Sequence, residues 1–204
     1  MKWGYLRGPG FVPPDIATAS DIPYPLNSMA TGLATFLLNI TSTAQVQNLQ
    51  LLRGIPSLTS PAQSGVQNWT FTPATLNGNA VSSNLYVSVV FNPFNPGGTQ
   101  FRGVPLPPPR SPLAPNAQQF KPAQITSPSF AISPVDSVSK GAVVLDVTIR
   151  IGGQATNIKV IRDIPSLTQP AIQCVNTWGF NPATYQGQPI LSQMIIAIVF
   201  QPMN

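Results

Sequence analysis

The clearest alternation of apolar and more polar positions lies in the second half of the chain. Five apolar residues occupy every second position there: Val143, Leu145, Val147, Ile149 and Ile151. This spacing predicts a strand with one apolar face. Gly152-Gly153 then predicts a tight turn into a second strand over residues 156–161, so that the two strands form a hairpin.

A helical pattern follows the hairpin. Apolar or small residues recur at helical spacing at Ala171, Cys174, Val175 and Trp178. Thr168 is the candidate N-cap, Pro170 lies in the expected first turn, and Gly179 is the candidate C-cap. A last strand is expected over residues 192–200, after a turn over residues 181–187. The predicted unit is therefore ββαβ, a three-stranded antiparallel sheet with one helix across one face.

The chain contains this unit twice. Residues 24–95 align without a gap with residues 133–204. The longest match places Arg53 to Gly78 (RGIPSLTSPAQSGVQNWTFTPATLNG) over Arg162 to Gly187 (RDIPSLTQPAIQCVNTWGFNPATYQG). Self-similarity over this length predicts two homologous domains, 24–95 and 133–204. The expected fold class is thus α+β, with two tandem ββαβ domains.

Two irregular segments are expected beside the domains. Residues 96–132 contain nine prolines and little periodicity, which predicts a proline-rich linker in polyproline II conformation. Residues 1–23 form a second irregular segment, an N-terminal arm. Both carry apolar residues that a free linker would not need, so we expect them to act as strands or straps along the domains. The aromatic residues of the arm are candidate partner contacts: Trp3, Tyr5 and Phe11.

Composition excludes much of enzyme chemistry. Only 7% of the residues are charged, and the chain has no His, no Glu, one Cys (Cys174) and five Asp residues. A Ser/His/Asp triad, a Cys/His dyad and a His-based zinc site all lack parts. We therefore expect no catalytic activity, no cofactor and no metal site. Cys174 is interpreted as a partly buried small residue of the helix.

The net charge of +5 does not predict a nucleic-acid partner, because the ten cations are scattered along the sequence. The longest uninterrupted apolar run, Met194 to Phe200, is far shorter than the roughly 20 residues of a membrane span. Residues 1–23 contain Lys2 and Arg7 but no apolar core of a signal peptide. We expect either a cytosolic protein or a processed form of an exported one.

The order of motifs resembles the C-terminal domain of TonB-family proteins. In the second copy the similarity rests on a helix segment and the residues after it: Leu167, Ala171, Val175, Trp178, Phe180, Pro182, Ala183, Gly187, Pro189 and Ile190. In the first copy it rests on the matching positions: Leu58, Ala62, Val66, Trp69, Phe71, Pro73, Ala74, Gly78 and Val81. Tyr24-Pro25 also resembles the Tyr-Pro that opens the family's domain.

The resemblance implies a domain that binds other proteins by offering a sheet edge to an extended peptide. It implies a periplasmic or cell-surface location, where the usual partner is the periplasmic segment of an outer-membrane receptor. An open edge is suited to this role because its backbone groups can pair with another strand. We expect the chain to differ from energy transducers of the family, with no membrane anchor and with two copies of the domain.

Several residues have more than one interpretation. Trp69 and Trp178 are expected to close each helix onto its sheet, with partner contact as the alternative. Arg53 and Arg162 recur in both copies, and could either bind a partner carboxylate or fix the turn from strand to helix. In the last strand both faces are apolar, with Met194 on one and Ile195, Ala197 and Val199 on the other. Because an exposed face should be more polar, we expect this second face to be covered by the linker, the arm or another subunit.

Two functions therefore remain open. The first is a non-enzymatic envelope protein whose tandem domains bind an extended segment of another protein by strand addition. The second is a self-assembling subunit of a surface or extracellular fibre or lattice, in which the same edges and arms join identical copies. The candidate partner-binding residues are the same in both cases: Met194, Ile195, Ala197, Val199, Arg162, Arg53, Trp3, Tyr5 and Phe11.

Overall fold

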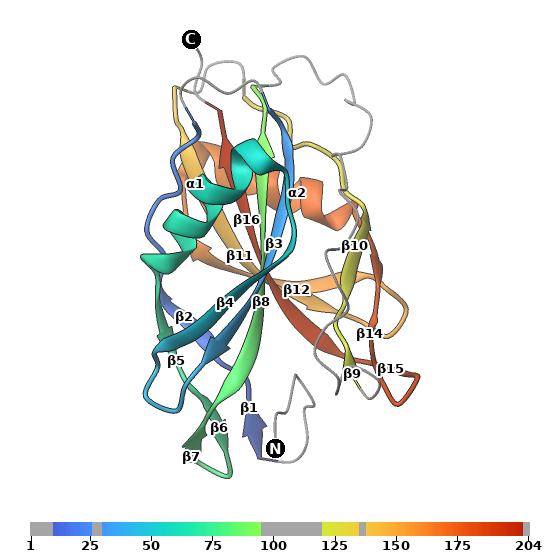
Figure 1. Ribbon diagram of the computed structural model, residues 1–204. Coiled ribbons are helices and arrows are strands. Elements are labelled where there is room, and N and C mark those ends of the chain that lie inside the picture. The colour runs from blue at the N-terminus through green and yellow to red at the C-terminus, as the bar shows by residue number, and fades with distance from the viewer. Residues whose placement is uncertain (1–9, 26–29, 95–119, 135–137, 202–204) are drawn as a thin grey trace.

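The computed structural model describes residues 10–25, 30–94, 120–134 and 138–201 (Figure 1). The central elements of the first half are β3 (Gly32–Ile40), β4 (Val46–Arg53), α1 (Pro56–Gln67) and β8 (Ser83–Asn92). Those of the second half are β11 (Gly141–Ile149), β12 (Ala155–Arg162), α2 (Pro165–Asn176) and β16 (Ser192–Phe200). The two halves thus follow the same order of strand, strand, helix and strand, and each element begins at the residue that the sequence repeat equates.

The strands of both halves form one continuous sheet, which differs from the two separate three-stranded sheets expected from the sequence. Its order is β12-β11-β16-β8-β3-β4. Within each half the strands are antiparallel, whereas β16 and β8 join the halves as a parallel pair. The register of that pair runs from Ile195↔Val87 to Phe200↔Asn92. The sheet is therefore mixed, and its two outer strands are β12 and β4.

The two helices cover opposite faces of this sheet (Figure 1). Helix α1 buries Leu58, Ala62 and Val66 in a core that includes Ile195 of β16. Helix α2 packs in a second core that includes Ile196 of the same strand. Successive side chains of a strand point to opposite faces, so the two cores lie on the two sides of the sheet. This explains why both faces of β16 are apolar.

Short strands in the arm and the linker, the segments expected to be irregular, pair with short strands of the two repeat units. The first half has β1 (Phe11–Val12), β2 (Asp15–Thr18), β5 (Thr70–Thr72), β6 (Ala74–Leu76) and β7 (Asn79–Val81). The second half has β9 (Phe120–Lys121), β10 (Gln124–Ser127), β13 (Gly179–Asn181), β14 (Ala183–Tyr185) and β15 (Gln188–Ile190). Strands β1 and β2 pair with β6 and β5, and β9 and β10 pair with β14 and β13. The prediction that the arm and the linker supply strands is confirmed for these residues.

The helix boundaries differ from the sequence prediction. Helix α2 begins at Pro165, not beside Thr168, and its N-cap is Ile164, which makes no side-chain capping bond. The Thr168 hydroxyl instead accepts a hydrogen bond from the Ile164 amide, at 2.9 Å, from one turn inside the helix. Proline at the first helical position explains the earlier start, because its fixed φ suits that position and its missing N–H is not needed there. The C-cap is Thr177 rather than Gly179.

Gly179 has a different role. It begins β13 and pairs with Ser127 of β10. A Cβ atom at this position would lie 2.4 Å from the Ser127 Oγ. Gly179 leaves room for the Ser127 hydroxyl, which accepts a hydrogen bond from the Gly179 amide at 3.1 Å. It does not form a left-handed helix end, and the equivalent residue of the first half is Thr70.

Candidate functional site

The open edges of the sheet are the candidate site, since the sequence predicted binding at a sheet edge. In an isolated ββαβ unit the last strand would have a free edge. In this structure the edges of β16 and β8 that would otherwise be free pair with each other over six residue pairs. Two long edges remain in the described part of the chain, along β4 and along β12.

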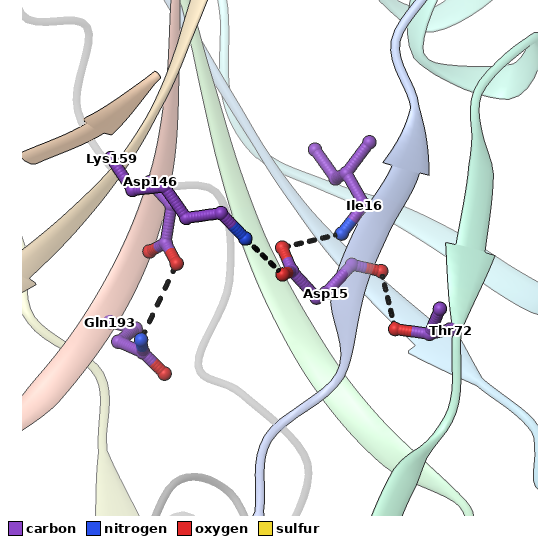
Figure 2. A network of polar contacts seen from close by, with 6 residues as sticks. All are labelled: Asp15, Ile16, Thr72, Asp146, Lys159 and Gln193. Atoms are coloured by element: carbon purple, nitrogen blue, oxygen red, sulfur yellow. Dashed lines mark hydrogen bonds and ion pairs between the residues drawn. The ribbon is translucent and has the colours of Figure 1, made fainter. Parts of the chain in front are cut away.

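The β12 edge is flanked by the N-terminal segment of the chain. The Lys159 Nζ lies 2.6 Å from the Asp15 Oδ2 of β2, and Figure 2 shows the two side chains pointing toward one another. The hydrogen bond to Asp15 is the largest of the effects that raise the pKa of Lys159. The Lys159 side chain is 58% exposed, so this ion pair contributes little to stability. The ion pair shows where β2 lies beside β12.

Asp15 is also fixed from its own side. Its Oδ1 accepts a hydrogen bond from the Ile16 amide at 2.8 Å, and its carbonyl accepts one from the Thr72 hydroxyl of β5 at 3.4 Å (Figure 2). The same view shows Asp146 of β11 accepting a hydrogen bond from the Gln193 side chain of β16 at 3.4 Å. These contacts place a group of polar side chains near the middle of β11 and β12, where Asp146 and Lys159 lie.

Arg162 at the end of β12 has a second carboxylate partner. Its guanidinium lies 3.2 Å from the Asp21 Oδ1 and donates a hydrogen bond to the Ala142 carbonyl. The Ala142 amide in turn donates to the Asp21 Oδ1 at 2.7 Å. Gly141, at φ +115°, completes the arrangement, since a Cβ there would lie 2.7 Å from that oxygen. Arg162 therefore fixes the chain's own N-terminal segment against β11, which is a positioning role.

Arg53 at the end of β4 is in a different environment. It is half-buried, and burial lowers the pKa of Arg53. Within the described residues the structure gives its guanidinium no carboxylate partner. The repeat explains the difference, because the residue equivalent to Asp21 in the second half is Phe130. Arg53 is thus a partly desolvated cation at the end of an open edge strand.

The two tryptophans close the helices onto the sheet, as predicted. Trp69 and Trp178 are each 4% exposed. The Trp69 Nε1 donates to the Ser20 carbonyl at 3.0 Å, and the Trp178 Nε1 donates to the Ser129 carbonyl at 3.1 Å. The Trp69 indole therefore fixes the arm and the Trp178 indole fixes the end of the linker. Neither indole offers an exposed surface to a partner.

The other predicted contact residues fall into two groups. Met194, Ile195, Ala197 and Val199 are buried in the chain's own cores, so they form no exposed surface in this structure. The prediction that the linker, the arm or another subunit covers Ile195, Ala197 and Val199 was wrong in its main part. The cover comes chiefly from the first repeat unit, and the arm contributes through Ile16 and Ile22. Phe11 is partly buried in β1, where it pairs with Leu76. Trp3 and Tyr5 lie outside the described residues.

The described residues offer few groups for catalysis or metal binding. Cys174 is buried at 7% exposure, desolvation raises the pKa of its thiol, and its Sγ donates to the Ser129 carbonyl at 3.2 Å. The described residues contain no cluster of His, Cys, Asp or Glu that could hold a metal ion. No helix among them is both long enough and apolar enough to cross a membrane.

An exposed sheet edge can accept an extended peptide as an added strand, which is one way in which protein-interaction domains bind. Comparison with protein families agrees with this class: residues 137–202 match the family described as Gram-negative bacterial TonB protein C-terminal. The match covers about a third of the chain and supports a TonB C-terminal-like domain in the second half. Such a domain suggests a protein-interaction role in the periplasm of Gram-negative bacteria. Searches of curated proteins and of solved structures found no match.

Proposed function

We propose that the chain is a periplasmic protein-interaction protein that binds an extended segment of another protein by adding it as a strand to an edge of its sheet. The observation that carries the proposal is the sheet order, which ends in β12 and β4 with no further strand paired to either among the described residues. An edge strand carries unpaired backbone N–H and C=O groups along its length, and an extended peptide can satisfy them.

The first half acts, in this proposal, as a second TonB C-terminal-like copy. Support comes from the gap-free sequence repeat and from the matching order of elements in the two halves. Pairing of β16 with β8 removes the inner edge of each copy, so each copy contributes one outer edge. Self-assembly through the same outer edges is the alternative that the sequence leaves open.

Site-specific photo-crosslinking in a Gram-negative periplasm tests the proposal. A photo-reactive amino acid would replace Gln47 on β4 or Asn157 on β12, which are exposed positions on the two edges. Val138, which is 85% exposed and lies outside the sheet, is the matched control position. Strand addition predicts adducts with a different protein at an edge position and none at Val138.

Two results would contradict the proposal. Adducts that contain only second copies of the chain would support self-assembly instead. Edge positions that yield no more adduct than Val138 would remove the edges as binding sites of either kind.

A further inference from the structure

The two outer edges are not equivalent, although they come from equivalent positions of the repeat. In β12, Asn157 has a positive φ of +45°. The pairing of β12 with β11 shifts register twice, and only two continuous pairs lie between the shifts, Leu145↔Val160 and Asp146↔Lys159. No residue of β4 has a positive φ. Its pairing with β3 also shifts register twice, but the four pairs between the two shifts are continuous, from Phe36↔Leu51 to Asn39↔Asn48. Bulges make an edge irregular, so the longer continuous run and the absence of a positive φ make β4 the more regular template for an added strand.

The distribution of charged residues also favours β4 over β12 as the edge that accepts an added strand. Lys159 lies near the middle of β12, and the equivalent residue of β4 is Gln50. A lysine on an edge strand opposes the pairing of another strand. The contact of Lys159 with Asp15 also holds β2 beside β12. Strand β4 contains no proline and no charged residue before Arg53 at its end, and its exposed positions are Gln47, Asn48 and Gln50.

The environment of Arg53 indicates the charge of the segment that would pair with β4. Its counterpart Arg162 is neutralised by Asp21, which the chain itself supplies. Arg53 is half-buried without such a partner among the described residues. A partly desolvated guanidinium gains most from a carboxylate, which can accept two parallel hydrogen bonds from it. The position equivalent to Asp21 holds Phe130, so among the described residues the chain itself supplies no carboxylate to Arg53.

We propose that the β4 edge is the binding edge, and that it receives an extended segment of a partner protein whose carboxylate pairs with Arg53. The inference rests on the proposed function and specifies its edge and the chemistry of its partner. A second copy of the chain meets these requirements less well, because β4 contains no acidic residue. Pairing β4 of one copy with β4 of another would leave both Arg53 guanidinium groups without a carboxylate from the added strand.

The test uses the whole chain and a phage-displayed library of linear decapeptides as the probe. Selected peptides would be synthesised and their dissociation constants measured by calorimetry, with amide chemical shifts recorded by NMR. We expect the selected sequences to share an Asp or Glu at one position and to shift the amides of Val46–Arg53. Replacing that acid by its amide, or Arg53→Gln in the protein, should weaken binding at least about tenfold. The matched substitution Arg162→Gln should change binding less than about twofold.

Backbone methylation of the selected peptide provides a readout that leaves the fold of the protein untouched. N-methyl groups at every second residue should abolish binding in one register, where the N–H groups face β4, and preserve it in the other. Equal loss in both registers would contradict strand addition at this edge.

Other outcomes separate this inference from the proposed function. Peptides that bind through β12, or that bind β4 without any need for an acid, would overturn the inference and leave strand addition standing. Recovery of no binding peptide, with sedimentation showing that the chain pairs with itself through β4, would overturn both. Recovery of no binding peptide by a monomeric chain would likewise count against the β4 edge as a peptide site.

Discussion

Ile195 of β16 and Val87 of β8 are paired neighbours in parallel strands that come from opposite halves of the chain. Ile195 is 2% exposed and belongs to the core that α1 closes, although α1 lies in the other half. Each half thus depends on the other to bury an apolar strand. We therefore predict one cooperative structure with two outer edges in place of two independent domains.

Truncation of either tryptophan tests this shared stability. Trp69→Ala or Trp178→Ala should lower the free energy of unfolding by about 3 to 5 kcal/mol, because each removes a large buried ring. Urea denaturation followed by circular dichroism measures the change. Since the halves share one sheet, each variant should still unfold in a single transition, and Val138→Ala at an exposed position should have no effect. Two separate transitions would contradict the shared sheet.

Gly141 supports the contact between the N-terminal segment and β11. Gly141→Ala should destabilise the protein by more than Gly78→Ala, although both glycines have positive φ. Backbone strain of about 1 to 3 kcal/mol applies at each position. Only at Gly141 would the new Cβ also meet the Asp21 carboxylate, since Gly78 has nothing within 4 Å. Thermal melts of the two variants give the comparison, and equal losses of stability would show that the Asp21 contact does not constrain β11.

Alkaline pH should weaken the fold. Burial raises the pKa of Tyr24 to about 12, and burial also raises the pKa values of Tyr86 and Cys174. The folded state therefore retains protons that the unfolded chain releases above its ordinary values of 9.0 for the thiol and 10.0 for the phenol. Their contribution to stability is complete below pH 9 and is lost as the pH rises toward 12, by about 1 kcal/mol or more between pH 10 and 12.

Urea midpoints at pH 7, 9 and 11 measure this loss. Tyr24→Phe should reduce the decline at high pH, at the cost of the hydrogen bond from the Tyr24 hydroxyl to the Ala30 carbonyl at 2.7 Å. A midpoint that does not fall between pH 9 and 11 would contradict the burial of these groups.

The Cys174 thiol should be inert in the folded protein. It is buried, its pKa is raised by desolvation, and its Sγ hydrogen bonds to Ser129. Reaction with an aromatic disulfide reagent should be slow in buffer and fast in denaturant. The control is Val138→Cys, a thiol at an exposed position. A native Cys174 that reacts as fast as the Val138→Cys thiol would place this thiol at the surface.

Much of the fold could be predicted from the sequence, because apolar periodicity and the internal repeat act locally. The pairing of β16 with β8 could not, since it joins strands that are remote in sequence. Its signal was present in the apolar Ile195 face, which requires a cover but does not say which segment supplies it. The short strands of the arm and the linker also leave a signal in the sequence, because the repeat extends into both segments. The gap-free alignment continues through Phe11/Phe120, Pro13/Pro122, Ile16/Ile125 and Ser20/Ser129.

The candidate site was less predictable. The recurrence of Arg53 and Arg162 indicated that both matter, with a partner carboxylate and a structural role as alternatives. Only the positions of Asp21 and Phe130 beside the sheet distinguish the two arginines, and those depend on the tertiary path of the segments before each half. The longer continuous run of pairs in β4 and the positive φ of Asn157 in β12 are likewise features of the backbone geometry.

Amide hydrogen exchange measured by NMR tests the central claim most directly. One continuous sheet with β16 and β8 at its centre predicts that the amides of these two strands exchange slowest, including those that face the partner half. The outward-facing amides of β4 and β12 should exchange fastest among the long strands. Rapid exchange along the facing edges of β8 and β16, together with protection of every amide of β4, would contradict both the joined sheet and the open edge.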